Sequence, residues 1–170
     1  MVVTRMKAAI AGAMLLLGGA AAAANAGAAG QQARLNSYAE VPTLSTTGTG
    51  TYRATLNTTA NRIRYTLSYR NLTTPVQQAH IHLGRPAIAG GISAFLCSNL
   101  QGAPAGTPAC PRRRGSVSGV ITPADVIGPT DQGLGAGHFH ELTSAIRAHA
   151  AYVNVHTNRF PSGEIRGMIR

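Results

Sequence analysis

Two histidines separated by a single residue, His80 and His82, are the side chains of this sequence best suited to bind a metal ion. They lie in the segment 78–83, in which polar and apolar residues alternate. Successive side chains of a β-strand point to opposite faces, so the two histidines share one face while Ala79 and Ile81 point to the other. Their backbones are then about 7 Å apart, which lets the two imidazoles converge on one ion.

The segment 152–157 repeats this alternation and contributes a third histidine. Val153 and Val155 are expected to face the core, which leaves Asn154 and His156 on the polar face. A turn-rich link then leads to another alternating segment, so a C-terminal hairpin is predicted. Keeping the apolar residues on one face fixes its register. The expected cross-strand pairs are Val155 with Ile165, His156 with Glu164, and Asn154 with Arg166.

These residues suggest a binding site for copper or zinc. His80, His82 and His156 would supply imidazole nitrogens, which suit both ions. Glu164 would either orient His156 or bind the cation itself. The alternative is that the three histidines only form hydrogen bonds with neighbouring polar side chains and backbone groups.

The rest of the chain predicts an all-β protein, because short alternating segments are separated by Gly, Pro, Asn and Thr. The expected architecture is a Greek-key-like β-sandwich or barrel with a C-terminal hairpin. One short amphipathic helix is expected over 140–148, packed on a sheet edge or barrel end, and a single helical turn is expected at 122–125. The expected strands are 32–38, 48–57, 62–70, 76–83, 92–97, 115–121, 151–157 and 164–169.

Residues 1–26 have the features of an export signal: a basic start, an apolar run and a small-x-small cleavage site at Ala24–Ala26. The mature domain is then 27–170, which is one domain's worth of chain. The apolar run is too short and too rich in alanine for a membrane span, so we expect no transmembrane segment in the mature chain. The protein is expected in the periplasm or outside the cell.

The two cysteines of the chain, Cys97 and Cys110, are expected to form a disulfide, because an exported protein meets an oxidising compartment. Closing a loop of this size contributes about 3 kcal/mol in the chain-entropy model. A redox or metal-binding thiol pair is the alternative, but the spacing is not C-x-x-C.

The chain is strongly basic. Without residues 1–26 it has 13 arginines and 5 acidic residues, a net charge of +8. Such a charge favours polyanions, including acidic components of the cell envelope. The arginines are scattered along the sequence apart from Arg112–Arg114, and aromatic residues are few, so specific nucleic-acid binding is not expected.

Four segments are spread over nearly the whole mature chain: Glu40–Pro42, Ala79–His82, Tyr152–Thr157 and Gly163–Gly167. Together they resemble the CHRD (chordin-type) domain. The ending YVNVHT followed by GEIRG is the most specific part. The resemblance implies an extracellular β-sandwich or barrel, often found as a single exported domain in bacteria, with no established activity. His80, His82, Asn154, His156, Glu164 and Arg166 occupy motif positions.

No catalytic centre is predicted. The paired histidines of an exported β-domain also resemble copper–zinc superoxide dismutase, which gives an enzymatic alternative. However, the sequence lacks a bridging loop with histidine and aspartate, since His138 and His140 lie in a glycine-rich approach to the predicted helix. A G-x-S-x-G nucleophile elbow is absent, and with five acidic residues in the chain we do not expect a carboxylate-pair hydrolase. We therefore expect a non-catalytic binding or structural module.

Overall fold

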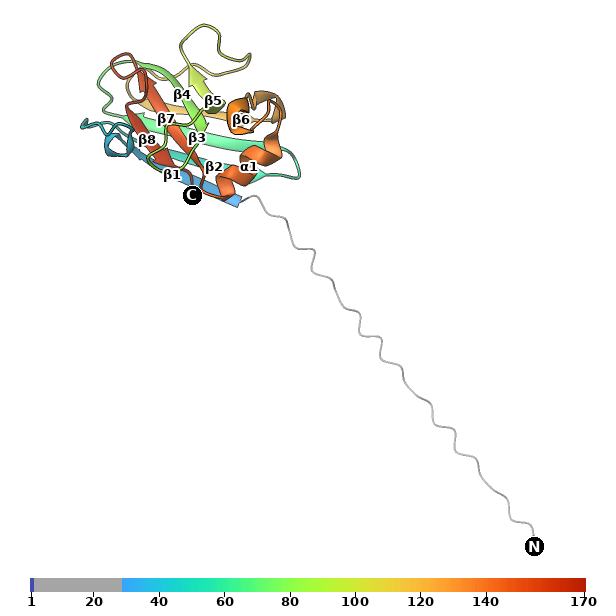
Figure 1. Cartoon of the computed structure of the whole chain (residues 1–170). Coiled ribbons are helices and arrows are strands. Elements are labelled where there is room, and N and C mark those ends of the chain that lie inside the picture. The colour runs from blue at the N-terminus through green and yellow to red at the C-terminus, as the bar shows by residue number, and fades with distance from the viewer. Residues whose placement is uncertain (2–28) are drawn as a thin grey trace.

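Eight antiparallel strands form the framework of the protein (Figure 1). The structure, a computed structural model, describes residue 1 and residues 29–170. Apart from residue 1, the predicted export segment 1–26 therefore lies outside the described residues. All eight predicted strands are confirmed, with bounds that differ by at most three residues. The strands are β1 (Ala29–Asn36), β2 (Thr49–Asn57), β3 (Arg62–Arg70), β4 (Val76–Leu83), β5 (Ile92–Ser98), β6 (Gly115–Ile121), β7 (Ala151–Thr157) and β8 (Ile165–Met168).

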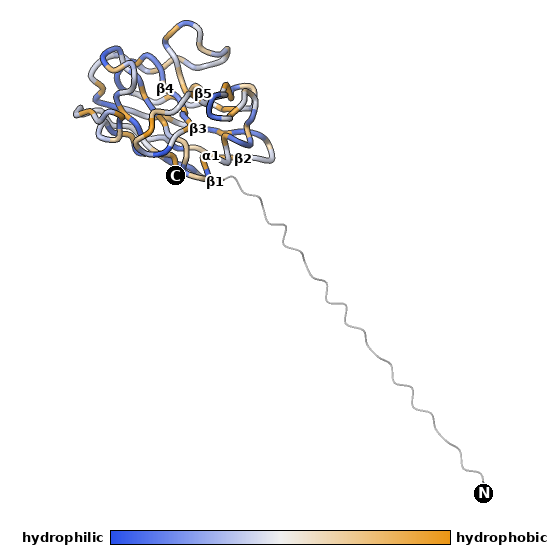
Figure 2. The backbone as a smooth tube through the Cα atoms, viewed as in Figure 1, coloured by the Kyte–Doolittle hydropathy of each residue, from blue (hydrophilic) through white to orange (hydrophobic). Residues whose placement is uncertain are grey.

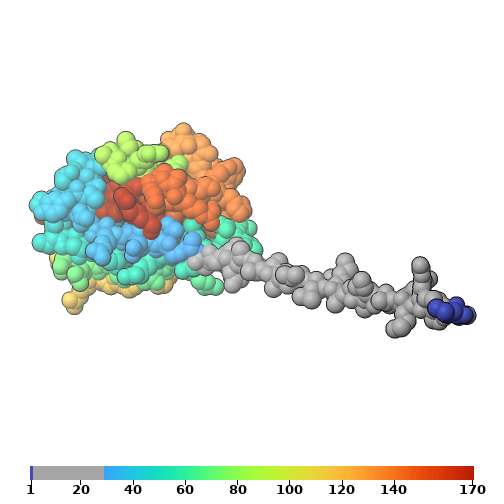
Figure 3. All heavy atoms as spheres, turned by 90° about the horizontal axis from the view of Figure 1, so that it is seen from below, coloured from blue at the N-terminus to red at the C-terminus, as the bar shows by residue number. Residues whose placement is uncertain are grey.

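The strands form one sheet with the order β5-β4-β7-β8-β1-β2-β3-β6. Strands β1, β2 and β3 form a meander, after which the chain crosses to β4 and β5 on the other side of the molecule. The last strand, β8, lies between β7 and β1, and Figure 3 shows this red segment between the blue N-terminal strand and the orange-red β7. The sheet curls until its edge strands β5 and β6 contact each other. The result is a nearly closed barrel, and the predicted all-β class is confirmed.

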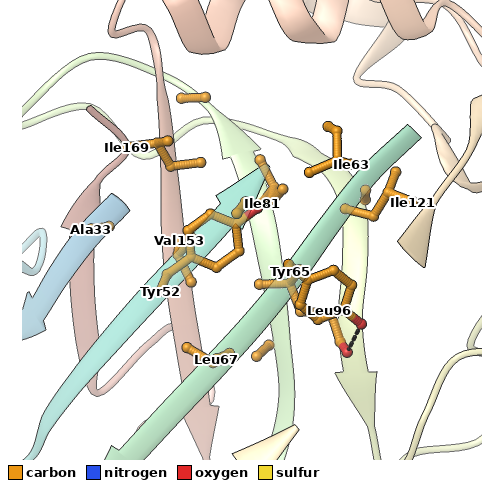
Figure 4. Close-up of a cluster of buried hydrophobic side chains, with 14 of the residues drawn as sticks. Ala33, Tyr52, Ile63, Tyr65, Leu67, Ile81, Leu96, Ile121, Val153 and Ile169 are labelled. Atoms are coloured by element: carbon orange, nitrogen blue, oxygen red, sulfur yellow. Dashed lines mark hydrogen bonds between the residues drawn. The ribbon is translucent and has the colours of Figure 1, made fainter. Parts of the chain in front are cut away.

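Alternating side chains explain why the sheet closes around a single core. In β3 the residues Ile63, Tyr65, Leu67 and Tyr69 are buried, as their spacing predicts, and the residues between them face outward. Figure 2 shows hydrophobic and hydrophilic residues interspersed along the strands. Side chains from strands far apart in the sequence meet in the core, among them Tyr52, Ile63, Ile81, Leu96, Val153 and Ile169 (Figure 4).

A hydrogen bond and a disulfide stabilise the open edge of the barrel. The Tyr65 hydroxyl donates a hydrogen bond to the Leu96 carbonyl at 2.6 Å, which joins β3 to β5 through the core (Figure 4). Cys97 of β5 and Cys110 in the segment before β6 form a disulfide with a Cα–Cα distance of 5.0 Å. The predicted disulfide is thus confirmed.

Helices are few and short. The helix α1 (Phe139–Arg147) lies within one residue of its predicted start and end, and its buried Leu142 and Ile146 join the core cluster. The predicted turn at 122–125 is a 3₁₀ turn, Pro123–Asp125, in which the Asp125 carboxylate accepts a hydrogen bond from the Thr122 amide. Two further 3₁₀ turns were not predicted, Ser37–Ala39 and Thr130–Gln132. None of the helices in the described residues has the length and apolar character of a membrane span.

Candidate metal centre

Pairing between β4 and β7 brings the three predicted histidines onto one face of the sheet. The two strands are antiparallel neighbours, with Gln78 opposite His156 and His80 opposite Asn154. His80 and His156 are therefore diagonal neighbours across the strand pair, a relation that places Cβ atoms within reach of long side chains. The alternate residues, including Ile81 and Val153, point to the other face and belong to the core. The prediction of a shared histidine face is thus matched by the structure.

The three imidazoles form a compact, buried cluster. The ring centroids lie 4.9 Å apart for His80 and His156, 5.4 Å for His80 and His82, and 5.6 Å for His82 and His156. One ring nitrogen from each residue can be chosen so that all three lie within 4.8 Å of one another. The Nδ1 atom of His80 is 3.1 Å from the Nε2 atom of His156. Two nitrogens bound to one tetrahedral ion at about 2.0–2.1 Å lie about 3.3 Å apart, so this pair already has the spacing of two ligands.

Backbone carbonyls fix the orientation of two of the rings. Nδ1 of His82 donates a hydrogen bond to the Gly90 carbonyl at 2.9 Å, and Nδ1 of His156 donates one to the Pro161 carbonyl at 2.9 Å. A carbonyl oxygen can only accept, so Nδ1 carries the proton in both rings and Nε2 keeps a free lone pair. This is the arrangement that metal-binding histidines usually have, with the outer nitrogen bonded to a carbonyl or carboxylate.

Two ring nitrogens of the cluster are buried and have no hydrogen-bond partner. They are Nε2 of His80 and Nε2 of His82. Nδ1 of His80 must supply the proton in its contact with His156, because Nε2 of His156 is unprotonated. Buried polar atoms are nearly always paired in folded proteins, so two unpaired lone pairs in one cluster indicate a site that can accept a further group.

Burial keeps the histidines neutral. Loss of solvation lowers the pKa of His80 to about 2, and repulsion from His156 and His82 acts in the same direction. Loss of solvation also lowers the pKa of His82 to about 4 and lowers the pKa of His156. Neutral imidazole is the form that binds metal ions, so the cluster is ready to bind at neutral pH without losing protons.

A loop between β4 and β5 covers the cluster on one side. Its Gly90 carbonyl accepts the bond from His82, and its Gly90 amide donates one to the Tyr152 hydroxyl at 3.0 Å. A side chain at position 90 would collide with the Leu83 carbonyl, so only glycine lets the loop approach β4 this closely. The Arg166 guanidinium donates further bonds to the carbonyls of the same loop.

Aromatic and cationic groups stack beside the histidines. The Tyr152 ring lies parallel to the His82 ring at 4.9 Å, and the Arg166 guanidinium lies 3.5 Å from the centre of the Tyr152 ring. Phe95 packs edge-on to His80 at 4.3 Å. These contacts limit rotation of the rings, which preserves the ligand geometry.

The structure places Glu164 outside the cluster. The pairs Val155 with Ile165 and Asn154 with Arg166 form as expected, but the strand pairing ends at Ile165. The Glu164 amide instead donates to the Val155 carbonyl. The Glu164 carboxylate accepts hydrogen bonds from the hydroxyls of Thr73 and Thr157 and from the Thr73 amide. It therefore ties the chain before β4 to the end of β7 and does not contact His156.

Another buried carboxylate, Glu40, was not predicted as a site residue. It lies beside Asn154, whose Nδ2 donates to it at 3.5 Å, and its Oε1 atom has no partner. Burial raises the pKa of Glu40 to about 7, although Arg166 acts in the opposite direction. The sequence did contain a signal for Glu40, since it belongs to Glu40–Pro42, one of the four segments that resemble the CHRD domain.

The remaining histidines do not join the cluster. His138 contacts Glu141 at the exposed start of α1, and Nδ1 of His149 contacts the Ile169 carbonyl. In residues 29–170, His80, His82 and His156 are the group of metal-binding side chains that lie close enough to share an ion.

A family model described as the CHRD domain matches residues 31–169. The chain belongs to the CHRD family. Neither a comparison with curated proteins nor one with solved structures found a match. The match begins within β1 and covers β2 to β8, so His80, His82 and His156 lie within the matched residues. The CHRD family is not a known enzyme family.

Proposed function

We propose that this CHRD protein is an exported, non-catalytic module that binds one transition-metal ion through His80, His82 and His156. The observation that carries the proposal is the pair of unpartnered Nε2 atoms in a buried, neutral cluster. A cluster that served only to hold the fold together would be expected to satisfy these atoms by hydrogen bonds. Export is supported by the signal-like residues 1–26 and by the disulfide.

The donor set favours copper and zinc. Three imidazoles suit both ions, and divalent copper precedes zinc in the usual order of affinities for nitrogen ligands. Calcium and magnesium prefer oxygen ligands, and the carboxylates of Glu40 and Glu164 are not part of the cluster. We therefore expect copper to bind more tightly than zinc, and calcium and magnesium not to compete.

Metal binding requires one local rearrangement. The hydrogen bond between Nδ1 of His80 and Nε2 of His156 must break. In this bond the Nε2 lone pair of His156 accepts the proton of His80, so it cannot bind an ion at the same time. His80 is free to present either ring nitrogen, since its Nε2 has no partner to lose. His82 and His156 keep their carbonyl bonds and need only small movements.

The test is a competition titration of metal-free protein with copper and with zinc, using a chromophoric chelator. We expect one ion per chain for the wild type. His82→Ala and His156→Ala should each weaken binding about 100-fold or more, because a direct ligand contributes at least as much as the groups that orient it. His140→Ala is the matched control, since His140 is exposed on α1 and should leave the affinity unchanged.

Thermal melting supplies a second readout. A metal that binds only the folded protein at 100 times its dissociation constant stabilises it by about 2.7 kcal/mol, which raises Tm by about 5–10 °C for a domain of this size. The proposal fails if the wild type binds neither ion, or if His82→Ala and His156→Ala bind metal as tightly as the wild type does.

The superoxide dismutase-like alternative gains no support from the described residues. A copper–zinc enzyme of that kind would need a second ligand set beside the first, and His138 and His140 lie on the α1 side, apart from the cluster. The Tyr152 and Arg166 stack also occupies the space beside His82.

A further inference from the structure

Arginines that are scattered in the sequence gather on one face of the barrel. The outward positions of β1, β2 and β3 alternate with the buried ones, and the meander aligns them. The five arginines on this arginine face are Arg34, Arg53, Arg62, Arg64 and Arg70, all exposed. None of the strands β1, β2, β3 and β6 contains an acidic residue, so no carboxylate on these strands neutralises the arginines.

Strand register places three of them on one diagonal. Arg53 pairs with Gln32 of β1, and Gln32 is the next outward residue along β1 from Arg34. Arg64 pairs with Thr55 of β2, and Thr55 is the next outward residue along β2 from Arg53. Diagonal neighbours of this kind lie about 7–8 Å apart. Arg34, Arg53 and Arg64 therefore form a line of positive charges across three adjacent strands, which Figure 1 shows side by side.

Hydroxyl groups fill the outward positions between and beside the arginines. Pairs of them bridge β3 and β6, with Thr66 and Ser118 at 2.8 Å and Ser68 and Ser116 at 3.0 Å. A shallow hollow of about 250 Å³ lies between Arg53 and Arg64. The outward hydroxyl residues are Thr49, Thr51, Thr55, Thr66, Ser68, Ser116 and Ser118.

We propose that this arginine face binds an acidic polysaccharide. Guanidinium groups bind carboxylates and sulfates in a bidentate manner, and neighbouring hydroxyls suit a polymer that is itself rich in hydroxyls. The line of regularly spaced charges fits an extended chain with repeated anionic groups. Because β8 separates the strands of this face from the histidine strands β4 and β7, the proposal is independent of metal binding.

Other polyanions fit the face less well. Among its strands the one exposed large hydrophobic residue is Val120, so the face has almost nothing to insert into a membrane. It presents no aromatic ring on which nucleic-acid bases could stack, because Tyr52, Tyr65 and Tyr69 all point into the core.

The experiment measures binding of the purified protein to heparin and to polygalacturonate at 0.15 M salt, with neutral dextran, phosphatidylglycerol vesicles and single-stranded DNA as comparisons. We expect the two acidic polysaccharides to bind most tightly, with an affinity that falls as salt is raised. Arg53→Ser/Arg64→Ser should weaken polysaccharide binding about tenfold, since two exposed ion pairs are lost.

The matched control is Arg147→Ser/Arg159→Ser, which removes the same charge from α1 and from the segment after β7. It should change the affinity less than twofold. Arg53→Lys/Arg64→Lys keeps the charge and tests bidentate recognition, so we expect it to bind more weakly than the wild type but more tightly than the serine variant. All substituted residues are exposed, and circular dichroism melting confirms that each variant folds.

Three results would overturn the proposal. One is that Arg53→Ser/Arg64→Ser and the control Arg147→Ser/Arg159→Ser weaken polysaccharide binding equally, which would mean that only net charge matters. The second is tighter binding to vesicles or to DNA than to either polysaccharide. The third is no binding to heparin or polygalacturonate at 0.15 M salt. His82→Ala should bind both polysaccharides normally, so failure here and failure of metal binding are distinguishable.

Discussion

Acid should destabilise the metal-free protein because its buried histidines resist protonation. The pKa of a histidine in the unfolded chain is about 6.5, whereas burial lowers the pKa of His80 to about 2 and that of His82 to about 4. The unfolded state therefore binds more protons below pH 6.5. The contribution of these histidines to the free energy of unfolding is complete above pH 6.5. It is lost as pH falls towards about 4 for His82 and about 2 for His80.

The magnitude follows from linkage. Each histidine that stays neutral in the folded protein lowers the free energy of unfolding by about 2 kcal/mol as the pH falls from 7 to 5. His80 and His82 together account for about 4 kcal/mol, and His156 adds to the same direction. The raised pKa of Glu40, about 7, opposes this by about 2 kcal/mol over the same range, because its carboxyl takes up a proton in the folded state.

The assay is urea unfolding at pH 7, 6 and 5 with a chelator present, followed by circular dichroism or tyrosine fluorescence, since the chain has no tryptophan. His80→Gln should reduce the pH-dependent loss by about 2 kcal/mol relative to the wild type, because Glu40 contributes equally to both proteins and cancels. His140→Gln, at an exposed position, should behave as the wild type. Identical pH dependence in His80→Gln and the wild type would show that this imidazole is already solvated or charged in the folded protein.

Three further predictions concern the buried carboxylate, the ligand protonation and the disulfide. Between pH 5.5 and pH 9, the free energy of unfolding of the wild type should fall by about 2 kcal/mol relative to that of Glu40→Gln, measured by urea unfolding of both proteins; a carboxyl with an ordinary pKa would give parallel curves. Metal affinity, measured by chelator competition, should stay nearly constant from pH 7 to pH 5.5, because the ligands are already neutral. A fall of ten-fold or more over that range would indicate ordinary imidazoles. Cys97→Ser/Cys110→Ser should lower the free energy of unfolding by about 3 kcal/mol, and an unchanged urea midpoint would argue against a stabilising disulfide.

Strands such as β2 and β3 were predictable because they bury alternate residues. Period-two patterns such as that of β3 specify both the strand and the face that each side chain occupies. The hairpin register, with Val155 opposite Ile165, followed from the same rule, since a one-residue slip would place Glu164 and Arg166 in the core. Parity alone therefore assigned His80, His82 and His156 to polar faces.

The sequence could not show which strands are neighbours. Strands β4 and β7 are separated by two further strands and α1 in the chain, and their pairing depends on how the whole barrel closes. The carbonyls of Gly90 and Pro161 come from loops, whose paths no periodicity predicts. The position of Glu164 was missed because the strand pairing stops at Ile165, the residue that follows Glu164 in the chain, and the Glu164 carboxylate accepts a hydrogen bond from Thr157.

The arginine face illustrates the same limit. Along the chain Arg34, Arg53 and Arg64 are far apart and form no run of charge. The meander of β1, β2 and β3 aligns them on a diagonal. A pattern that depends on cross-strand register becomes visible only when the sheet is known.

Crystals of the protein loaded with copper or zinc provide the most direct test of the metal site. An anomalous difference map recorded at the metal absorption edge should contain one strong peak, about 2.0–2.3 Å from a ring nitrogen of each of His80, His82 and His156. A map without a peak among these three rings, or with peaks only at the exposed His138 and His140, would contradict the account.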